Sequence, residues 1–239
     1  MGRIGNIIQR KSKQDSKKAG LFTKLGRNIM VAAREGGPDP EYNSSLESAI
    51  EKAKAANMPN DNIDRAIKKG AGGLEGAEFI QIHYEGYGPS GVALLVECLS
   101  DNVNRTAGDI RSYFSKCGGN LGTNGCVSYL FDHAGVLVID KEDSMEEDEM
   151  MMLALEAGAE DFISEEGHFE IYSSVEDFGR VRDQLKNQGF SFSMAELRYL
   201  PQNSVRLEKE EDQKNMQKLM DFLEDNDDVQ NVYSNWDEA

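Results

Sequence analysis

The sequence is poor in the residues that most often carry catalysis and metal binding. It has only three histidines and three cysteines in 239 residues. The intervals between Cys98, Cys117 and Cys126 match no zinc-binding pattern, and no histidine lies near them in the sequence. No Gly-x-Ser-x-Gly or His-Glu-x-x-His motif is present. These absences predict a protein that is not an enzyme, has buried free thiols, and needs no metal or cofactor.

Long apolar stretches are also missing. No run approaches the roughly 20 residues that a membrane-spanning helix needs. The basic N-terminus is not followed by the apolar segment of a secretory signal, and Asp15 with the periodic helix beyond it disfavours a transit peptide. We therefore expect a cytoplasmic protein with neither a membrane nor a small-molecule partner. The sequence leaves the oligomeric state open, with a monomer as the expectation.

Positive charge is scarce except at one end of the chain. The formal net charge is −17. Residues 1–76 hold 14 Lys and Arg against 9 Asp and Glu, a net of +5, whereas residues 77–239 carry a net of −22. A chain that gathers its cations in one segment has the charge pattern of a protein with an anionic partner, and a nucleic acid is the commonest such partner.

Apolar spacing separates a helical segment from two segments of mixed structure. Steps of three and four residues predict helices over 21–34, 44–57 and 60–69. Beyond residue 78 the period changes to two. Strands are expected at 79–84, 92–99, 127–131 and 136–140, with a turn at 86–91 and a helix from Asn102 or Asn104 to Lys116.

The second half of the chain has a recognisable order of elements. Strands at 136–140, 161–164, 168–173 and 190–200 alternate with helices from Ser144 and over 175–187, which gives the β-α-β-β-α-β order of a ferredoxin-like unit. The segments after residue 201 are too few to form a core alone. The predicted fold is α+β, an N-terminal helical bundle followed by two α/β domains, one ferredoxin-like and inserted in the other. The predicted domains are 1–76, 77–133 with 201–239, and 134–200.

The basic side chains of the first domain are the candidate site. A cationic face lies beside the apolar stripe of the first helix, and more cations end the third. The alternative for the helix face is a solvated surface, and for the last group it is complementation of the helix dipole. The candidate nucleic-acid-binding residues are Arg10, Lys11, Lys13, Lys17, Lys18, Lys24, Arg27, Arg34, Arg65, Lys68 and Lys69.

Two other features favour a structural role. The glycines of residues 118–125 follow a helix and precede a strand, which is the reverse of a nucleotide-binding loop, so we interpret them as a turn. Asn102 and Asn104 have the side chains of a helix N-cap.

Several strings along the chain are specific enough to compare with known proteins. They are residues 22–25 (FTKL), 31–37 (VAAREGG), 53–59 (AKAANMP), 65–70 (RAIKKG), 84–89 (YEGYGP), 104–106 (NRT) and 118–122 (GGNLG). Together they resemble the YebC/PmpR family, which includes the mitochondrial translational activator of cytochrome c oxidase subunit one. The opening, Gly2-Arg3-Ile4-Gly5-Asn6, departs from the Gly-His-Ser-Lys-Trp-Ala-Asn that is usual there, and is similar to a divergent sub-branch.

The resemblance implies a helical N-terminal domain, two α/β domains and work on nucleic acid. Some members are described as DNA-binding transcriptional regulators, and others act on ribosomes during translation. Three functions stay open at this point: a DNA-binding transcriptional regulator, a translation factor that binds rRNA on the ribosome, and a protein-interaction module. The acidic second helix, with Glu41, Glu47 and Glu51, disfavours reading of a major groove.

Overall fold

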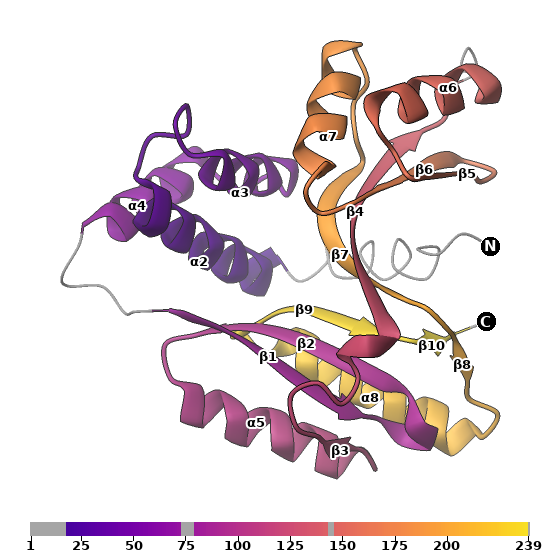
Figure 1. Cartoon of the computed structure of the whole chain (residues 1–239). Helices are drawn as coiled ribbons and strands as arrows, with labels where there is room; N and C mark the ends of the chain where they lie inside the picture. Colours follow the sequence, from indigo (N-terminus) through magenta and orange to yellow (C-terminus); the bar gives the residue numbers. More distant parts are fainter. Residues whose placement is uncertain (1–17, 73–78, 143–145, 239) are drawn as a thin grey trace. The chain divides into compact units, whose positions relative to one another are not determined.

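The computed structural model describes residues 18–72, 79–142 and 146–238 (Figure 1). The chain divides into two compact units. We call Tyr129–Ser204 the inserted unit, because the other unit is formed by chain on both sides of it. That other unit contains a helical region, residues 18–72, and an α/β part, residues 79–128 and 205–238. The predicted α+β class is confirmed.

The helical region is built from α2 (Lys18–Gly36), α3 (Ser44–Ala55) and α4 (Asn60–Ala71). Its core contains Ile29 from α2, Leu46 from α3 and Ile63 from α4. Asn43 fixes the junction between the first two helices: its Oδ1 accepts a hydrogen bond from the Leu46 amide, and its Nδ2 donates to two carbonyl oxygens near the end of α2. All three helices lie close to their predicted positions.

The α/β part is a four-stranded antiparallel sheet in the order β3-β1-β2-β9, with α5 and α8 on one face (Figure 1). Leu94 and Val96 of β2 pack there against Phe114 of α5 and Leu219 of α8. The strand β2, predicted to be central, lies between β1 and β9. The elements are β1 (Ile80–Tyr87), β2 (Ala93–Ser100), α5 (Val103–Lys116), β3 (Asn120–Leu121), α8 (Glu210–Asp225) and β9 (Val229–Ser234), with the parallel pair β8 (Val205–Arg206) and β10 (Trp236–Asp237).

The inserted unit has the ferredoxin-like order β-α-β-β-α-β. Its antiparallel sheet runs β5-β6-β4-β7, and α6 and α7 cover one face, where Leu137, Phe169 and Leu185 are buried. The two strands β5 and β6 begin and end where the sequence predicts. The elements are β4 (Phe131–Asp140), α6 (Glu147–Ala157), β5 (Asp161–Ser164), β6 (His168–Ser173), α7 (Phe178–Asn187) and β7 (Met194–Pro201). The predicted cap Ser144 lies outside the described residues.

Two predictions about strands are wrong. Instead of separate strands at 127–131 and 136–140, the chain forms a short 3₁₀ turn at Ser128–Leu130 and then one continuous strand, β4. Strand β1 also runs through Gly86, where a turn was expected. The first error has a clear cause: the Val127 and Ser128 amides donate to the side chain of Glu85 rather than to a neighbouring strand.

Three further observations complete the fold. Cys98 and Cys117 are buried as expected, but Cys126 is partly exposed. Asn102, not Asn104, caps α5, since its Oδ1 accepts from the Arg105 amide. Among the described helices, none combines the length and the apolar content that crossing a membrane requires.

Candidate nucleic-acid interface

The predicted basic residues fall into three groups. Arg10, Lys11, Lys13 and Lys17 lie outside the described residues, and so does the side chain of Lys18 at the start of α2. Lys24 and Arg27 of α2 contact the α/β part of the same unit. Arg34, Arg65, Lys68 and Lys69 are exposed on the helical region.

Lys24 binds the end of another helix. Its Nζ donates to the carbonyl oxygen of Glu224 over 2.6 Å, in the last turn of α8. Burial lowers the pKa of Lys24, while the neighbouring carboxylates, Glu224 first, act in the opposite direction. The last turn of α8 has no basic residue of its own, so Lys24 supplies the cation that complements this helix terminus.

Arg27 makes a denser set of contacts. Its Nη1 lies 2.6 Å from Asp228 Oδ1, 2.7 Å from the Asp227 carbonyl oxygen and 3.3 Å from the Leu99 carbonyl oxygen. The guanidinium also lies over the ring of Phe79, at 5.3 Å from its centroid. A side chain held by three acceptors and an aromatic face is part of the fold.

Asp228 accepts hydrogen bonds from side chains of several elements, two of which are arginines. Only 4% of its surface is exposed. Its Oδ2 accepts from Arg105 Nη2 and Thr106 Oγ1, each at 2.7 Å, and from Ser100 Oγ at 3.2 Å. Burial raises the pKa of this carboxyl, but the hydrogen bonds from Arg105, Thr106 and Arg27 outweigh it and lower the pKa to about 2. We call these five residues the Asp228 junction.

The exposed cations of α4 remain available at the surface. Arg65 donates to the Asp61 carbonyl oxygen and to Asn62 Oδ1 within its own helix. Lys68 and Lys69 are exposed, and neither has an ion-pair partner among the residues that the structure describes. Helical spacing places Asn62, Arg65 and Lys69 on one stripe of α4.

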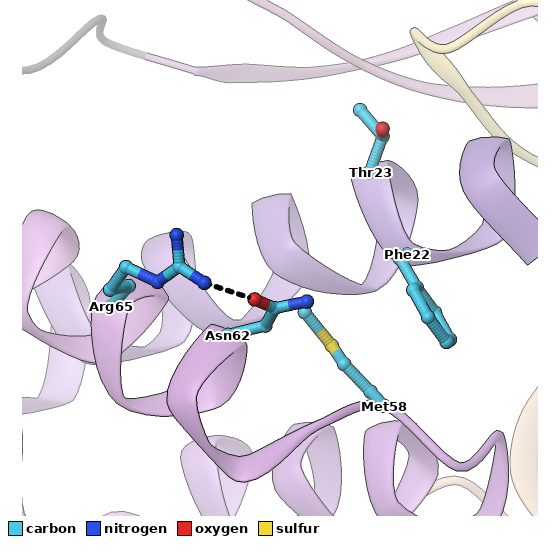
Figure 2. A pocket seen from close by; sticks show the side chains of 5 residues that line it. All are labelled: Phe22, Thr23, Met58, Asn62 and Arg65. Carbon is cyan, nitrogen blue, oxygen red and sulfur yellow. Dashed lines mark hydrogen bonds between the residues drawn. The ribbon is translucent and has the colours of Figure 1, made fainter.

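A hollow of about 260 Å³ opens beside this stripe. Phe22 and Thr23 of α2, Met58, and Asn62 and Arg65 of α4 line it (Figure 2). One side is the Phe22 ring and the Met58 thioether, and the other presents the Asn62 amide and the Arg65 guanidinium (Figure 2). Of the five lining residues, only Arg65 is among the residues predicted from the sequence, because nothing local distinguishes Phe22 and Met58 from ordinary core residues.

The glycine-rich loop is occupied by a carboxylate of the chain itself. Glu85 Oε1 accepts from the Gly125 amide, and Oε2 from the Val127 and Ser128 amides, at 2.8 to 2.9 Å. Burial raises the pKa of Glu85, but these three backbone hydrogen bonds prevail and lower it. The Gly119 and Gly122 amides also donate within the chain, to the carbonyl oxygens of Phe114 and Glu85, so the three glycine amides with nucleotide-loop spacing are not free for a phosphate.

Together these features define a class: an α+β protein whose helical region carries exposed cations and a small hollow, with α2 bound to the α/β part. The chain belongs to the TACO1/YebC family. The model of the family's N-terminal domain matches residues 2–73, and that of its second and third domains matches residues 79–236. The resemblance to the YebC/PmpR family is thereby confirmed.

Similar proteins cover nearly the whole chain. A probable transcriptional regulatory protein of Clostridioides difficile (strain 630) is 58% identical over 99% of both chains. Another, of Finegoldia magna (strain ATCC 29328), is 55% identical over 97% of this chain and 95% of its own. The crystal structure of a conserved hypothetical protein from Aquifex aeolicus superposes with a TM-score of 0.83, at 45% identity, over 95% of this chain and 93% of that one.

Proposed function

We propose that this protein is a regulator of gene expression that binds nucleic acid through its helical region, and that it acts as a DNA-binding transcriptional regulator. The observation that carries the proposal is the group of exposed cations Arg65, Lys68 and Lys69 at the end of α4. They belong to the segment of net charge +5 in a chain of −17. Its relatives' names, as probable transcriptional regulatory proteins, support the regulatory role.

The chemistry of these side chains suits contact with phosphates. Lys and Arg neutralise phosphate groups and release counterions, which gives an affinity that falls steeply with salt. Such contacts position a protein on the nucleic acid but do not read its sequence. The exposed Glu47 and Glu51 of α3 oppose insertion of that helix into a major groove. Binding to the backbone is the mode that this surface supports best.

A second candidate follows from the same surface. A translation factor that binds rRNA on the ribosome uses identical phosphate chemistry, and RNA recognition depends heavily on shape and unpaired bases. The hollow beside Arg65 is the observation that favours it, because a duplex offers no unstacked base.

The test compares matched charge reversals in the full-length protein. Lys68→Glu with Lys69→Glu is expected to abolish binding to a DNA duplex and co-sedimentation with ribosomes at physiological salt. The control, Lys116→Glu with Lys209→Glu, makes the same change of charge on exposed residues of the α/β part, and Lys116 also lies in the last turn of a helix. The proposal would be refuted if both double variants lost binding equally. It would also be refuted if the wild-type protein bound neither DNA nor ribosomes. Whether the wild-type protein binds duplex DNA or ribosomes at physiological salt decides between the two candidate functions.

A further inference from the structure

We propose that the hollow between α2 and α4 holds one unstacked base of a single-stranded nucleic-acid segment, with Phe22 as its stacking surface. The inference rests on the part of the proposed function that both candidates share, binding of nucleic acid by the helical region, and it names the form of nucleic acid that this region recognises. The five lining residues all belong to the helical region, which has its own core.

The apolar side of the hollow suits a flat ring. Phe22 is partly buried against the helical core, so its ring is held in place on one side and reachable on the other. Met58 is 7% exposed and fills the wall beside it. Base–aromatic stacking tolerates any base, because every base has a flat π-face, and a ring that is already held in place loses little conformational freedom when the base binds. The volume of about 260 Å³ lies below the range of roughly 300–1,000 Å³ typical of drug-sized ligands, which fits a single heterocycle.

The polar side of the hollow is already oriented. Arg65 Nη2 donates to Asn62 Oδ1 (Figure 2). Arg65 Nε donates to the Asp61 carbonyl oxygen. Because Asn62 Oδ1 is used in this way, its Nδ2 is left to donate to an acceptor on the edge of a base. The guanidinium keeps further N–H donors for a phosphate, with which it forms strong charge-assisted bonds.

The stripe on α4 gives the strand a path out of the hollow. Lys69 lies seven residues after Asn62 on the same face, which corresponds to about 10 Å along the helix. A base at Asn62 thus places the following phosphates near Arg65 and Lys69. A duplex cannot use this arrangement, because its bases are stacked inside and extruding one costs a few kcal/mol.

The experiment measures binding of the full-length protein by fluorescence anisotropy. The probes are a labelled RNA strand of about 12 nucleotides, the DNA strand of the same sequence, and its blunt duplex. Phe22→Leu keeps an apolar side chain in the core but removes the ring. It is expected to weaken binding of the single strands roughly 5- to 100-fold and to leave duplex binding unchanged. Whichever strand binds the wild type more tightly identifies RNA or DNA as the source of the base.

Two variants keep the test decisive. Asn62→Ala removes no core residue, so it reports on the hollow even if Phe22→Leu fails to fold, and it is expected to weaken single-strand binding as well. Tyr42→Leu removes an aromatic ring of the same region that is 85% exposed and lies outside the hollow, and it is expected to have no effect.

The outcomes separate this inference from the proposed function. Salt-sensitive binding that is unchanged by Phe22→Leu and Asn62→Ala would overturn the base-binding hollow and leave the proposed function standing. A loss caused by Tyr42→Leu instead would also overturn it. Failure of the wild type to bind either single strand at physiological salt would overturn the base-binding hollow, and failure to bind the duplex and ribosomes as well would overturn both.

Discussion

At the scale of single residues, the acidic segment at residues 224–228 has a role that its charge does not reveal. Asp228 is buried and accepts hydrogen bonds from two arginines and two hydroxyls, whereas its neighbour Asp227 is exposed. Removing one partner of a buried charged network leaves the remaining partners uncompensated. We expect Asp228→Asn to lower the free energy of unfolding by about 2–3 kcal/mol.

Trp236 is a fluorescent probe in the same part of the fold as Asp228, so its signal reports the unfolding that this prediction concerns. It is the only tryptophan of the chain, and it packs against the core of the α/β part. Urea unfolding followed by its fluorescence is expected to show the loss for Asp228→Asn and almost none for the control Asp227→Asn. Equal effects of the two substitutions would contradict the role given to the Asp228 junction.

The charge of Asp228 should also make the stability of the fold depend on pH. The pKa of Asp228 in the folded protein is about 2, below its ordinary value of 3.8. A depressed pKa contributes stability above the ordinary value, and that contribution, roughly 1–2 kcal/mol, is lost as the pH falls towards 2. The difference in stability between the wild type and Asp228→Asn should therefore narrow between about pH 4 and pH 2. A difference that stays constant over this range would show that the charge of Asp228 is not what stabilises the fold.

Glu85 offers a second test at this scale. Both of its oxygens accept backbone N–H groups, so Glu85→Gln would turn an NH₂ donor towards donors. We expect a loss of about 1–3 kcal/mol in the free energy of unfolding, again read from Trp236 fluorescence. The exposed Glu41→Gln is the control, with no change expected. A Glu85→Gln protein as stable as the wild type would mean that the loop is held by other contacts.

At the scale of elements, the sequence predicts the existence and type of nearly every helix and strand, and it misplaces those that depend on distant residues. The sequence predicts a turn that begins at Gly86, and it leaves Gly135 in the gap between two separate strands. Both lie inside strands, where a Cβ atom at Gly86 would collide with Phe114 and the Asn120 carbonyl, and one at Gly135 with Ser173 and Phe178. Glycine marks a tight turn or a close approach equally well, and only the partner residues decide which.

The close contacts of Gly135 inside β4 can be tested by substitution. Gly135→Ala should destabilise the inserted unit by about 1–3 kcal/mol, because its methyl group has no room between β4 and its neighbours. Gly179→Ala, in α7, meets nothing within 4 Å and should be neutral or stabilising by about 0.5–1 kcal/mol. Hydrogen exchange of the β4 and β6 amides measures the stability of the inserted unit in both variants. Equal protection in the two variants would refute the close-packing role of Gly135.

The candidate site likewise has features that the sequence predicts and features that depend on residues far away in the chain. Composition alone locates the cations in the first domain, but it cannot tell which of them face solvent. The partners of Lys24 and Arg27 lie 200 and 201 residues further along the chain. No local pattern connects residues at that separation, and so the two lysines Lys24 and Lys68 look equivalent in the sequence, although the first is bound to α8 and the second is exposed.

At the scale of the whole molecule, position rather than charge should decide which cations contribute to binding a polyanion. Each phosphate contact that is lost reduces the slope of log affinity against log salt by about 1. Lys68→Gln is therefore expected to reduce the slope by about 1 without altering stability. Lys24→Gln removes the same charge but also a partly buried hydrogen bond to α8, so it is expected to lower the free energy of unfolding by about 1–2 kcal/mol and to leave the slope unchanged.

This comparison isolates the effect of the fold, because both substitutions change the net charge of −17 by the same amount. Any uniform influence of net charge on a polyanion acts equally on both variants and cancels when their slopes are compared. A reduced slope for Lys24→Gln would mean that Lys24 leaves the Glu224 carbonyl oxygen when nucleic acid binds. In that case α2 would exchange its contacts with α8 for phosphates, and the binding surface would extend from α4 onto the face of α2 that the fold now covers.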